Sequence, residues 1–373
     1  MFMKLFIYLS LFLFVQTHFA QNDKIKLGVF GDYTGQTSSF GISTFSGIKM
    51  AVEEINAKGG INGKKLDIVI LNDEGKPENT LSVVTKLIED ENVDFLIGSP
   101  TSTNSLIAAA LAQKAKIPMI TPTATNPKVT EVGNYIFRAC FVDSVQGEVM
   151  AKFAFETLKL RKIALIVDLS SDYSKGLTDS FTTAFKKLGG KIVSRQFYNQ
   201  NEEDYGQLIS AVKKTNPDAI YLSGYYNQVS EIAQEARSQK MKATLLGGDG
   251  WDSPTLFEIG KKALDNSYIT NHFATSEPSD IVQNFVSVYK KLYNLEPDAF
   301  AALGYDSVNL LADALKRANS LDKTKVRDTL AETKNFIGVT GKFSFDENRN
   351  AKKPVYMLKI GNGRFVYNST VEQ

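Results

Sequence analysis

The sequence has few of the residues that most catalytic and metal sites use. Its 373 residues include one cysteine, Cys140, one tryptophan and two histidines, His18 and His272. A single cysteine excludes an internal disulfide. Zinc sites draw on more histidine and cysteine than this chain offers, so we expect no metal and no cofactor.

The chain also lacks a strong charge of either sign. It carries 43 lysine and arginine residues against 41 aspartate and glutamate residues, a formal net charge of +2. This balance gives no reason to expect nucleic acid as a partner. Beyond the first twenty residues, no segment stays apolar for the roughly 20 residues that a membrane-spanning helix needs.

The first twenty residues are typical of a secretory signal peptide. Lys4 precedes an apolar run over residues 5–15, and polar and small residues follow as far as Ala20. The run is too short for a membrane span, although an uncleaved anchor remains the alternative. No cysteine lies near the end of this segment, so the lipid-anchor site of bacterial lipoproteins is missing. We predict that residues 1–20 are removed and leave the cleavage position open.

Strand-like and helix-like segments alternate through the rest of the chain. Apolar runs at 25–30, 66–71, 93–97 and 117–121 alternate with helical patterns around 48–55, 77–89 and 102–114. The alternation restarts with helices at 145–158, 173–188, 205–214 and 229–239 and strands at 163–167, 192–197, 219–223 and 244–246. This alternation of strands and helices predicts an α/β architecture with two parallel sheets, each covered by helices on both faces.

The last third of the sequence predicts two long helices and a hairpin. The helices fall at 281–293 and 301–318, and the hairpin pairs 355–360 with 364–367 around Gly361-Asn362-Gly363. About 350 residues after the signal peptide are too many for one ordinary core. Because no tether separates the two similar halves, we expect several direct crossings between them.

Four segments, in order along the chain, resemble the type I periplasmic solute-binding proteins of branched-chain amino acid ABC transporters. They are Gly31-Asp32-Tyr33-Thr34-Gly35 with Glu54-Ile55-Asn56-Ala57-Lys58-Gly59-Gly60, Ile97-Gly98-Ser99-Pro100-Thr101-Ser102, Ile120-Thr121-Pro122-Thr123-Ala124-Thr125, and Gly224-Tyr225-Tyr226 with Gly247-Gly248-Asp249-Gly250. The resemblance covers nearly all of the chain after residue 20.

The resemblance implies two Rossmann-like, doubly wound lobes joined by three crossover segments, the Venus-flytrap arrangement. It places the crossings near 140–144, 270–273 and 345–352, with lobe 1 at 21–140 and 273–346 and lobe 2 at 141–272 and 347–373. It further implies a monomer in the periplasm that closes on an amino acid, branched-chain or small aliphatic, and delivers it to the membrane permease of an ABC transporter.

Two segments of lobe 1 are candidates for the polar part of the ligand site. Ser102 starts a helix, where free N–H groups and the helix dipole favour an anion, and the resemblance assigns it to the ligand carboxylate. The alternative is a plain helix cap. Thr123 and Thr125 follow a strand at the carboxyl edge of the sheet, where such sheets bind ligands. The resemblance implies that the Thr123 carbonyl and the Thr125 hydroxyl accept from the ligand ammonium and that the Thr125 N–H faces the carboxylate. The alternative is a turn stiffened by proline.

Asp249 and five further residues complete the predicted site. Asp249 stands in a glycine-rich loop where the family more often has glutamate, and would pair with the ammonium. A turn-forming aspartate is the alternative. The resemblance brings Tyr173 and Tyr225 over the ligand and makes Phe40 line the side-chain pocket. Pro100 and Thr101 would lie beside Phe40, and the slot would suit an aliphatic side chain.

Other functions fit the sequence less well. The first strand is not followed by the G-x-G-x-x-G pattern of dinucleotide-binding enzymes, and one histidine after residue 20 leaves a hydrolase with a single candidate base. A further enzyme hypothesis is a nucleophile pair formed by Cys140 and His272. It is disfavoured because buried cysteine is usually unreactive. The same fold could instead bind an amide, urea or aromatic acid, or act as a soluble sensor. We expect a binding protein and not an enzyme.

Overall fold

A five-stranded parallel sheet forms the centre of the first lobe. Its order is β2-β1-β3-β4-β5, built from β1 (Lys24–Gly31), β2 (Lys65–Asn72), β3 (Phe95–Ile97), β4 (Met119–Thr121) and β5 (Ile136–Arg138). The computed structural model describes residues 24–373, so the predicted signal peptide lies outside the described residues.

Alternate residues of these strands supply two separate cores, as a buried parallel sheet requires. Leu27 and Val29 face α1 (Ser38–Ala57), α11 (Ala299–Ala318) and α12 (Lys323–Ala331). Phe30 and Leu96 face α2 (Pro77–Glu89) and α3 (Ser102–Ala115) on the other side. The short helix α4 (Lys128–Glu131) follows β4. We call this sheet and its helices lobe 1.

The second lobe is built on a seven-stranded sheet with the order β15-β14-β10-β9-β8-β6-β7. Five strands run parallel: β6 (Lys162–Asp168), β7 (Lys191–Tyr198), β8 (Ala219–Leu222), β9 (Thr244–Gly247) and β10 (Tyr268–Asn271). The helices α5 (Asp143–Lys152) and α6 (Asp172–Lys187) cover one face of this sheet. The helices α7 (Gly206–Lys214), α8 (Tyr226–Ser238) and α9 (Pro254–Gly260) cover the other. We call this unit lobe 2.

A C-terminal hairpin completes the edge of lobe 2. The strand β14 (Val355–Gly361) pairs antiparallel with β10 and with β15 (Arg364–Val371). Its two-residue turn, Asn362-Gly363, has positive φ at both positions (54° and 69°). This is the turn that asparagine followed by glycine favours in a hairpin, so the predicted hairpin is confirmed.

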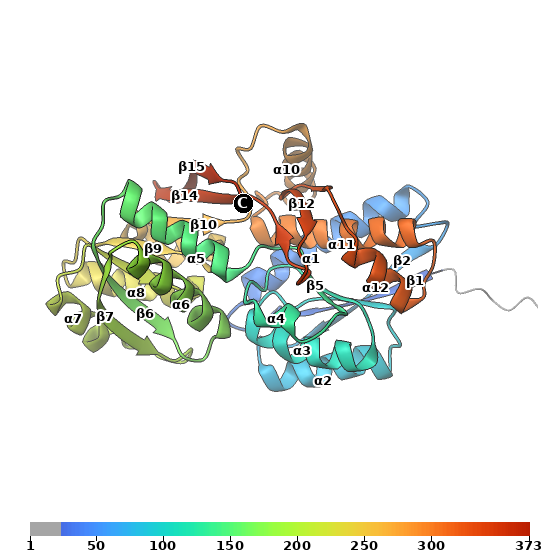
Figure 1. Cartoon of the computed structure of the whole chain (residues 1–373), viewed down its shortest axis with the longest axis horizontal. Coiled ribbons are helices and arrows are strands. Elements are labelled where there is room, and N and C mark those ends of the chain that lie inside the picture. The colour runs from blue at the N-terminus through green and yellow to red at the C-terminus, as the bar shows by residue number, and fades with distance from the viewer. Residues whose placement is uncertain (1–23) are drawn as a thin grey trace, which may run out of the picture.

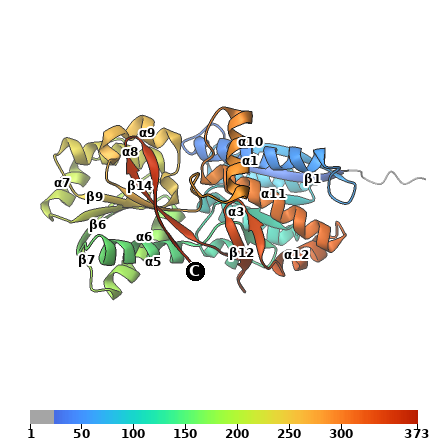
Figure 2. The ribbon, with the colours of Figure 1, turned by 90° about the horizontal axis from the view of Figure 1, so that it is seen from above.

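The chain passes between the two sheets three times. It leaves lobe 1 after β5, and returns after β10 through α10 (Asp280–Tyr293), α11 and α12. A small antiparallel sheet follows, formed by β11 (Phe336–Gly338), β12 (Gly341–Phe345) and β13 (Ala351–Lys352), and the chain then enters β14. Figures 1 and 2 show the two lobes end to end, with the late helices α11 and α12 on lobe 1 and the final hairpin on lobe 2. The α/β fold with two doubly wound lobes is confirmed.

A buried lysine ties two of these crossings together. Lys353, between β13 and β14, is 2% exposed, and its ammonium donates to the Ala139 carbonyl (3.0 Å) and to the Thr340 hydroxyl. Ala139 lies in the first crossing and Lys353 in the third. Burial lowers the pKa of Lys353 to about 8. The contact therefore fixes the relative position of two strands of the hinge.

The structure differs from the sequence expectations at short or irregular segments. The helix expected over 145–158 ends as α-helix at Lys152 and continues as a single π-helical stretch, Phe153–Thr157. The strand β5 and the small sheet β11–β13 were not expected from the sequence. They consist of two to five residues each, which is too short for a period to show.

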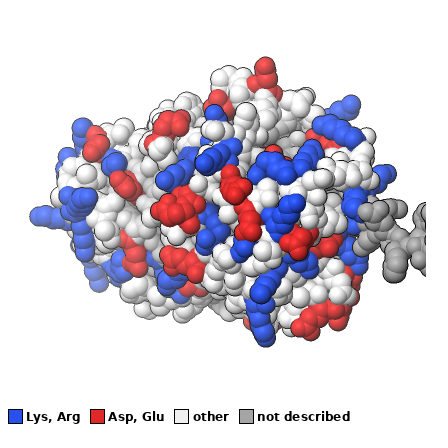
Figure 3. Space-filling view, turned by 45° about the vertical axis from the view of Figure 1, so that its right-hand side comes forward, with Lys and Arg blue, Asp and Glu red and all other residues white. Residues whose placement is uncertain are grey.

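The surface carries both signs of charge. On the face in Figure 3, lysine and arginine side chains alternate with aspartate and glutamate. Within residues 24–373, no helix has the length and apolar character needed to cross a bilayer.

Candidate ligand-binding cleft

The N-terminus of α3 lies at the carboxyl end of β3 and faces the gap between the lobes. Gly98 makes the turn possible, because a Cβ on it would lie 2.3 Å from the Phe30 carbonyl oxygen. Thr101, at the cap position, makes no side-chain capping bond. Ser102 is 1% exposed and its Oγ accepts a hydrogen bond from the Asn126 N–H (3.2 Å), which leaves its O–H free to donate. Free N–H groups and this hydroxyl make an anion site.

The loop after β4 lies against this helix start. The Thr123 hydroxyl donates to the Pro100 carbonyl (2.7 Å), so two predicted site residues are in direct contact. The Thr125 hydroxyl is fully buried, and the Asp143 carboxyl is close enough for this hydroxyl to lower its pKa by hydrogen bonding. A buried hydroxyl without a partner costs free energy. The Thr125 oxygen keeps its acceptor capacity at this point of the cleft.

A buried arginine that the sequence analysis did not identify holds this loop. Arg138, the last residue of β5, is fully buried, and its guanidinium donates to the carbonyls of Ala124 (2.5 Å), Asn126 (2.8 Å) and Pro127 (3.2 Å). Burial lowers the pKa of Arg138 from its usual value. Since three carbonyls within residues 124–127 share one rigid donor group, the loop cannot shift without breaking charge-assisted hydrogen bonds.

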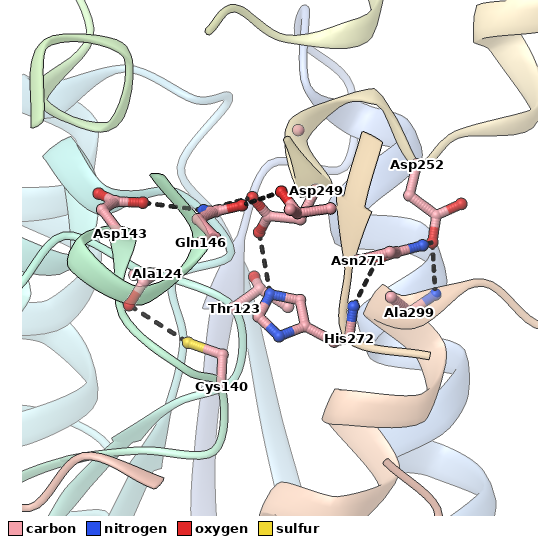
Figure 4. A network of polar contacts seen from close by, with 12 residues as sticks. Thr123, Ala124, Cys140, Asp143, Gln146, Asp249, Asp252, Asn271, His272 and Ala299 are labelled. Carbon is pink, nitrogen blue, oxygen red and sulfur yellow. Dashed lines mark hydrogen bonds and ion pairs between the residues drawn. The ribbon is translucent and has the colours of Figure 1, made fainter. Parts of the chain in front are cut away.

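Asp249 projects from lobe 2 and is almost completely buried. It begins a short 3₁₀ turn after β9 and is 3% exposed. Its Oδ1 accepts from Gln146 Nε2 (3.0 Å) and the Tyr173 hydroxyl (2.9 Å), and its Oδ2 lies 3.1 Å from His272 Nε2 (Figure 4). Burial lowers the pKa of His272, so this ring is neutral at pH 7. No lysine or arginine among residues 24–373 forms an ion pair with Asp249.

A second buried acid, which the sequence analysis also missed, lies behind Asp249. Gln146 Nε2 donates to Asp143 Oδ1 (3.0 Å) as well as to Asp249, and Gln146 Oε1 accepts from the Thr270 hydroxyl (2.8 Å). One amide therefore holds two carboxyl groups (Figure 4). Burial raises the pKa of Asp143 to about 7. The Asp143 N–H bonds the Thr125 carbonyl (2.9 Å) and so connects this network to the lobe 1 loop.

Aromatic side chains from both lobes meet across the cleft. The ring of Phe40, in α1 of lobe 1, packs edge-on against Tyr225 of lobe 2 with centroids 5.5 Å apart. Tyr225 in turn stacks on Tyr173 (5.2 Å), whose hydroxyl bonds Asp249. Phe40 also stacks on Phe300 of lobe 1 (3.9 Å). The predicted residues Phe40, Tyr225, Tyr173 and Asp249 thus form one continuous series of contacts.

The two lobes are closed on each other. The Gln36 carbonyl of lobe 1 accepts from the Tyr226 hydroxyl (3.0 Å) and Asn227 Nδ2 (2.6 Å) of lobe 2. Next to the predicted site residues, Asn126 Nδ2 donates to the Asp172 carbonyl (2.7 Å), and the Asp172 N–H donates to the Thr103 hydroxyl (3.1 Å). A cavity of about 40 Å³ between the lobes is lined by Thr101 and Tyr225, among others. Ligand sites for small molecules are larger, so entry of a ligand requires the lobes to separate.

The one cysteine is inert and does not pair with the histidine. Cys140 is fully buried, its thiol donates to the Ala124 carbonyl (3.4 Å), and burial raises its pKa to about 12. His272 directs Nε2 to Asp249 and stacks on Phe141 (3.6 Å). A thiol nucleophile needs a depressed pKa, and this environment has the opposite effect. Among residues 24–373, no group of three or more His, Cys, Asp or Glu side chains is placed to hold a metal ion.

The cleft has opposite electrical character at its two polar ends. The positive end of the α3 dipole and the Ser102 hydroxyl lie in lobe 1, and the buried Asp249 carboxylate lies in lobe 2. Such a pair of sites matches a small zwitterion. Sequence reasoning missed Asp143, Gln146 and Arg138, because a buried charged residue outside a motif has no local signature.

Comparison with known proteins identifies the family of the whole chain. The periplasmic binding protein family matches residues 24–364. A Leu/Ile/Val-binding protein homolog of Brucella suis is 30% identical over 351 residues, covering 92% of this chain and 93% of that protein. The crystal structure of a leucine binding protein from Thermotoga maritima superposes with a TM-score of 0.90 at 35% identity, covering 93% of this chain and 99% of that one.

A second solved structure is similar to the same extent. It is the branched-chain amino acid transporter substrate binding protein of Streptococcus pneumoniae in complex with isoleucine, with a TM-score of 0.89 and 34% identity, covering 94% of this chain and all of that one. With the family matched over nearly its whole described length, this chain belongs to the periplasmic binding proteins.

Proposed function

We propose that the protein is the extracytoplasmic substrate-binding component of an ABC importer and captures a branched-chain or other small aliphatic amino acid. The observation that carries the proposal is Asp249. Its carboxyl group is 3% exposed. Within residues 24–373, the only basic side chain within ion-pair distance is His272, and burial keeps that ring neutral. A buried anion without a cation is costly, and the ammonium group of an amino acid supplies that cation.

The amino acid carboxylate then binds at the opposite end of the cleft. The N–H groups of the first turn of α3 and the Ser102 hydroxyl donate to it. The ammonium donates to Asp249, to the Thr125 hydroxyl oxygen and to the Thr123 carbonyl, which accepts no hydrogen bond from the described chain. Three acceptors match the three hydrogens of an ammonium group.

The aliphatic side chain packs on apolar groups of both lobes. Phe40, Pro100 and Thr101 line it from lobe 1, and Tyr173 and Tyr225 cover it from lobe 2 when the lobes close. The relatives named for leucine, isoleucine and valine support this ligand class. Since each methylene contributes roughly 1 kcal/mol or more in such a pocket, the exact amino acid depends on sub-ångström placement of these five side chains.

The remaining parts of the proposal concern the cellular role. The protein acts as a monomer in the periplasm, and its closed form presents both lobes to a membrane permease. It is not an enzyme and binds no nucleic acid. The inert Cys140, the neutral His272 and the mixed surface charge support this.

The test is a thermal-shift screen of the exported protein after unfolding and refolding to remove carried ligand. The panel contains the twenty amino acids, urea, acetamide and benzoate. A ligand at hundredfold excess over its Kd stabilises a protein by about 2.7 kcal/mol. A response confined to leucine, isoleucine, valine and close relatives is the expected result. A response to benzoate or amides without any amino acid would refute the assignment of Asp249 to an ammonium group.

A further inference from the structure

A second cavity opens between the lobes on the side of the C-terminal hairpin. Its volume is about 730 Å³, within the range of small-molecule sites. Lobe 2 lines it with Asp252, α9 and the β14–β15 hairpin, and lobe 1 lines it with residues 273–276 and 296–298. Figures 1 and 2 show the hairpin beside the segment that leads to α10. None of the nine residues that are predicted to bind the amino acid lines this cavity.

Two acidic side chains from opposite lobes line the cavity next to each other. Asp252 is 6% exposed, and its Oδ2 accepts both of its hydrogen bonds, from Asn271 Nδ2 (2.9 Å) and from the Ala299 N–H (2.8 Å). Its Oδ1 accepts none, and Figure 4 shows this oxygen pointing away from both donors. Asp298, adjacent to Ala299, caps α11 through Oδ1, which accepts from the Ala301 N–H (2.9 Å) and the Ser43 hydroxyl.

Neither acid has a cationic partner among residues 24–373, where no ion pair includes Asp252 or Asp298. Burial raises the pKa of Asp252 to about 6, and burial together with the neighbouring Asp252 raises that of Asp298 to about 7. Two close carboxyl groups that resist joint ionisation form a site that a cation stabilises.

The rest of the cavity wall combines an apolar patch with polar groups, which include one further acid, Glu296, and one cation, Arg364. Phe257 and Phe365 pack edge to face with centroids 4.8 Å apart, and Leu358, Phe273 and Pro297 lie around them. An inorganic cation would leave this surface without a contact. A ligand with an ammonium group and an apolar tail uses both parts of the cavity.

We propose that this cavity is a second binding site, which takes a small primary amine with its ammonium group at Asp252 and Asp298 and its apolar tail on Phe257 and Phe365. Because the two acids belong to different lobes, the amine bridges the lobes and favours the closed arrangement. It therefore tightens amino acid binding in the main cleft, and the amino acid tightens amine binding by the same factor. Only this coupling rests on the proposed function.

Isothermal titration of the refolded exported protein with 3-methylbutylamine tests the site directly. The amine should bind, and 3-methylbutanol, which has the same tail without the charge, should not. Asp252→Asn and Asp298→Asn each keep an oxygen for the existing donors, and each should weaken amine binding about tenfold or more. Glu258→Gln, an exposed acid on α9 next to Phe257, is the matched control and should leave it unchanged.

Four results would overturn the proposal: no binding at millimolar amine, equal binding of the alcohol, undiminished binding in both aspartate variants, or loss of amine binding in Asp249→Asn instead. The last result would place the amine in the main cleft. Circular dichroism melting of each variant shows that the protein is folded. Titration of isoleucine with and without saturating amine then measures the coupling, and an equal isoleucine Kd in both would refute the bridging of the lobes.

Discussion

Replacing Asp249 by asparagine removes the negative charge of the proposed ammonium site and changes little else. The carboxylate accepts from Gln146, Tyr173 and His272 at 2.9–3.1 Å. The asparagine oxygen can keep one or two of these bonds, and the tyrosine hydroxyl can rotate to accept from the new amide. The folded state is therefore retained, since no lysine or arginine within residues 24–373 loses its partner.

The ligand, in contrast, loses a shielded charge-assisted hydrogen bond. Such a bond contributes about 1.5–3 kcal/mol, and each 1.4 kcal/mol is about tenfold in Kd. We expect isoleucine, or the aliphatic amino acid that binds best, to bind about ten- to a hundredfold more weakly. At a concentration that is a hundredfold excess over the original Kd, ligand stabilisation falls from about 2.7 to about 0.4 kcal/mol at the upper end of this range.

Isothermal titration calorimetry on refolded protein measures the change, and circular dichroism melting without ligand measures the fold. The matched control is Asp179→Asn, which removes a charge of the same sign from a side chain of lobe 2 that is 72% exposed. The control should keep the affinity of the original protein. An unchanged Kd in Asp249→Asn would remove this residue from the site and with it the main argument for an ammonium ligand.

Three further predictions follow from the same contacts. Ser102→Ala should weaken amino acid binding about three- to tenfold by calorimetry, less than Asp249→Asn, because the N–H groups of α3 remain; no change would make Ser102 a structural residue only. Arg138→Met should destabilise the protein by about 3 kcal/mol or more in urea unfolding, because three carbonyls of the loop lose their donor. The control is Arg195→Met, because the contacts of Arg195 with Asp179 are 3.4–3.5 Å long. It should change the free energy of unfolding by less than about 0.5 kcal/mol. Asp143→Asn should flatten the fall in stability between pH 4 and pH 7. The folded pKa of Asp143 is raised to about 7 from 3.8, so the folded state holds a proton that the unfolded chain has lost, and stability from this group is lost as pH rises through that window, by at most about 1.4 kcal/mol per pH unit. Urea unfolding at pH 5 and pH 7 measures the slope, and equal slopes in the two proteins would refute the assignment.

His272 acts in the opposite direction on the pH profile. Burial lowers its pKa below the usual 6.5, so its contribution to stability is present above that pH and is lost as pH falls through the folded value. The ring follows β10 and contacts both Asp249, a predicted ligand residue, and Phe141 of the first crossing.

Asp249 and His272 together also give a physical account of the shorter acid. Position 249 carries aspartate, which is one methylene shorter than the glutamate that the family more often has there. In the structure the side chain is held by Gln146, Tyr173 and His272. These three donors fix its carboxylate without the extra methylene.

Several parts of the fold were predictable because they leave a periodic signal. Alternating apolar runs and amphipathic helices predicted β1, β2, α2, α6 and the presence of two parallel sheets, and Asn362-Gly363 predicted the hairpin turn. The three-residue β5 and the strands β11–β13 could not be predicted in this way, since they are too short to show a period. The resemblance supplied the nine candidate ligand residues, and their role stays a prediction.

The sequence by itself determined the α/β class, the two similar halves and the residues on the strand ends, because periodicity and turn chemistry act over neighbouring positions. Only the tertiary structure decided which charges are buried together. Gln146, which also holds Asp143, joins Asp249 across 103 positions in the chain, and Arg138 finds its carbonyl partners only when β5 lies beside β4. The free energy of such groups depends on the loss of water around them and on their partners, and both arise only when the lobes pack.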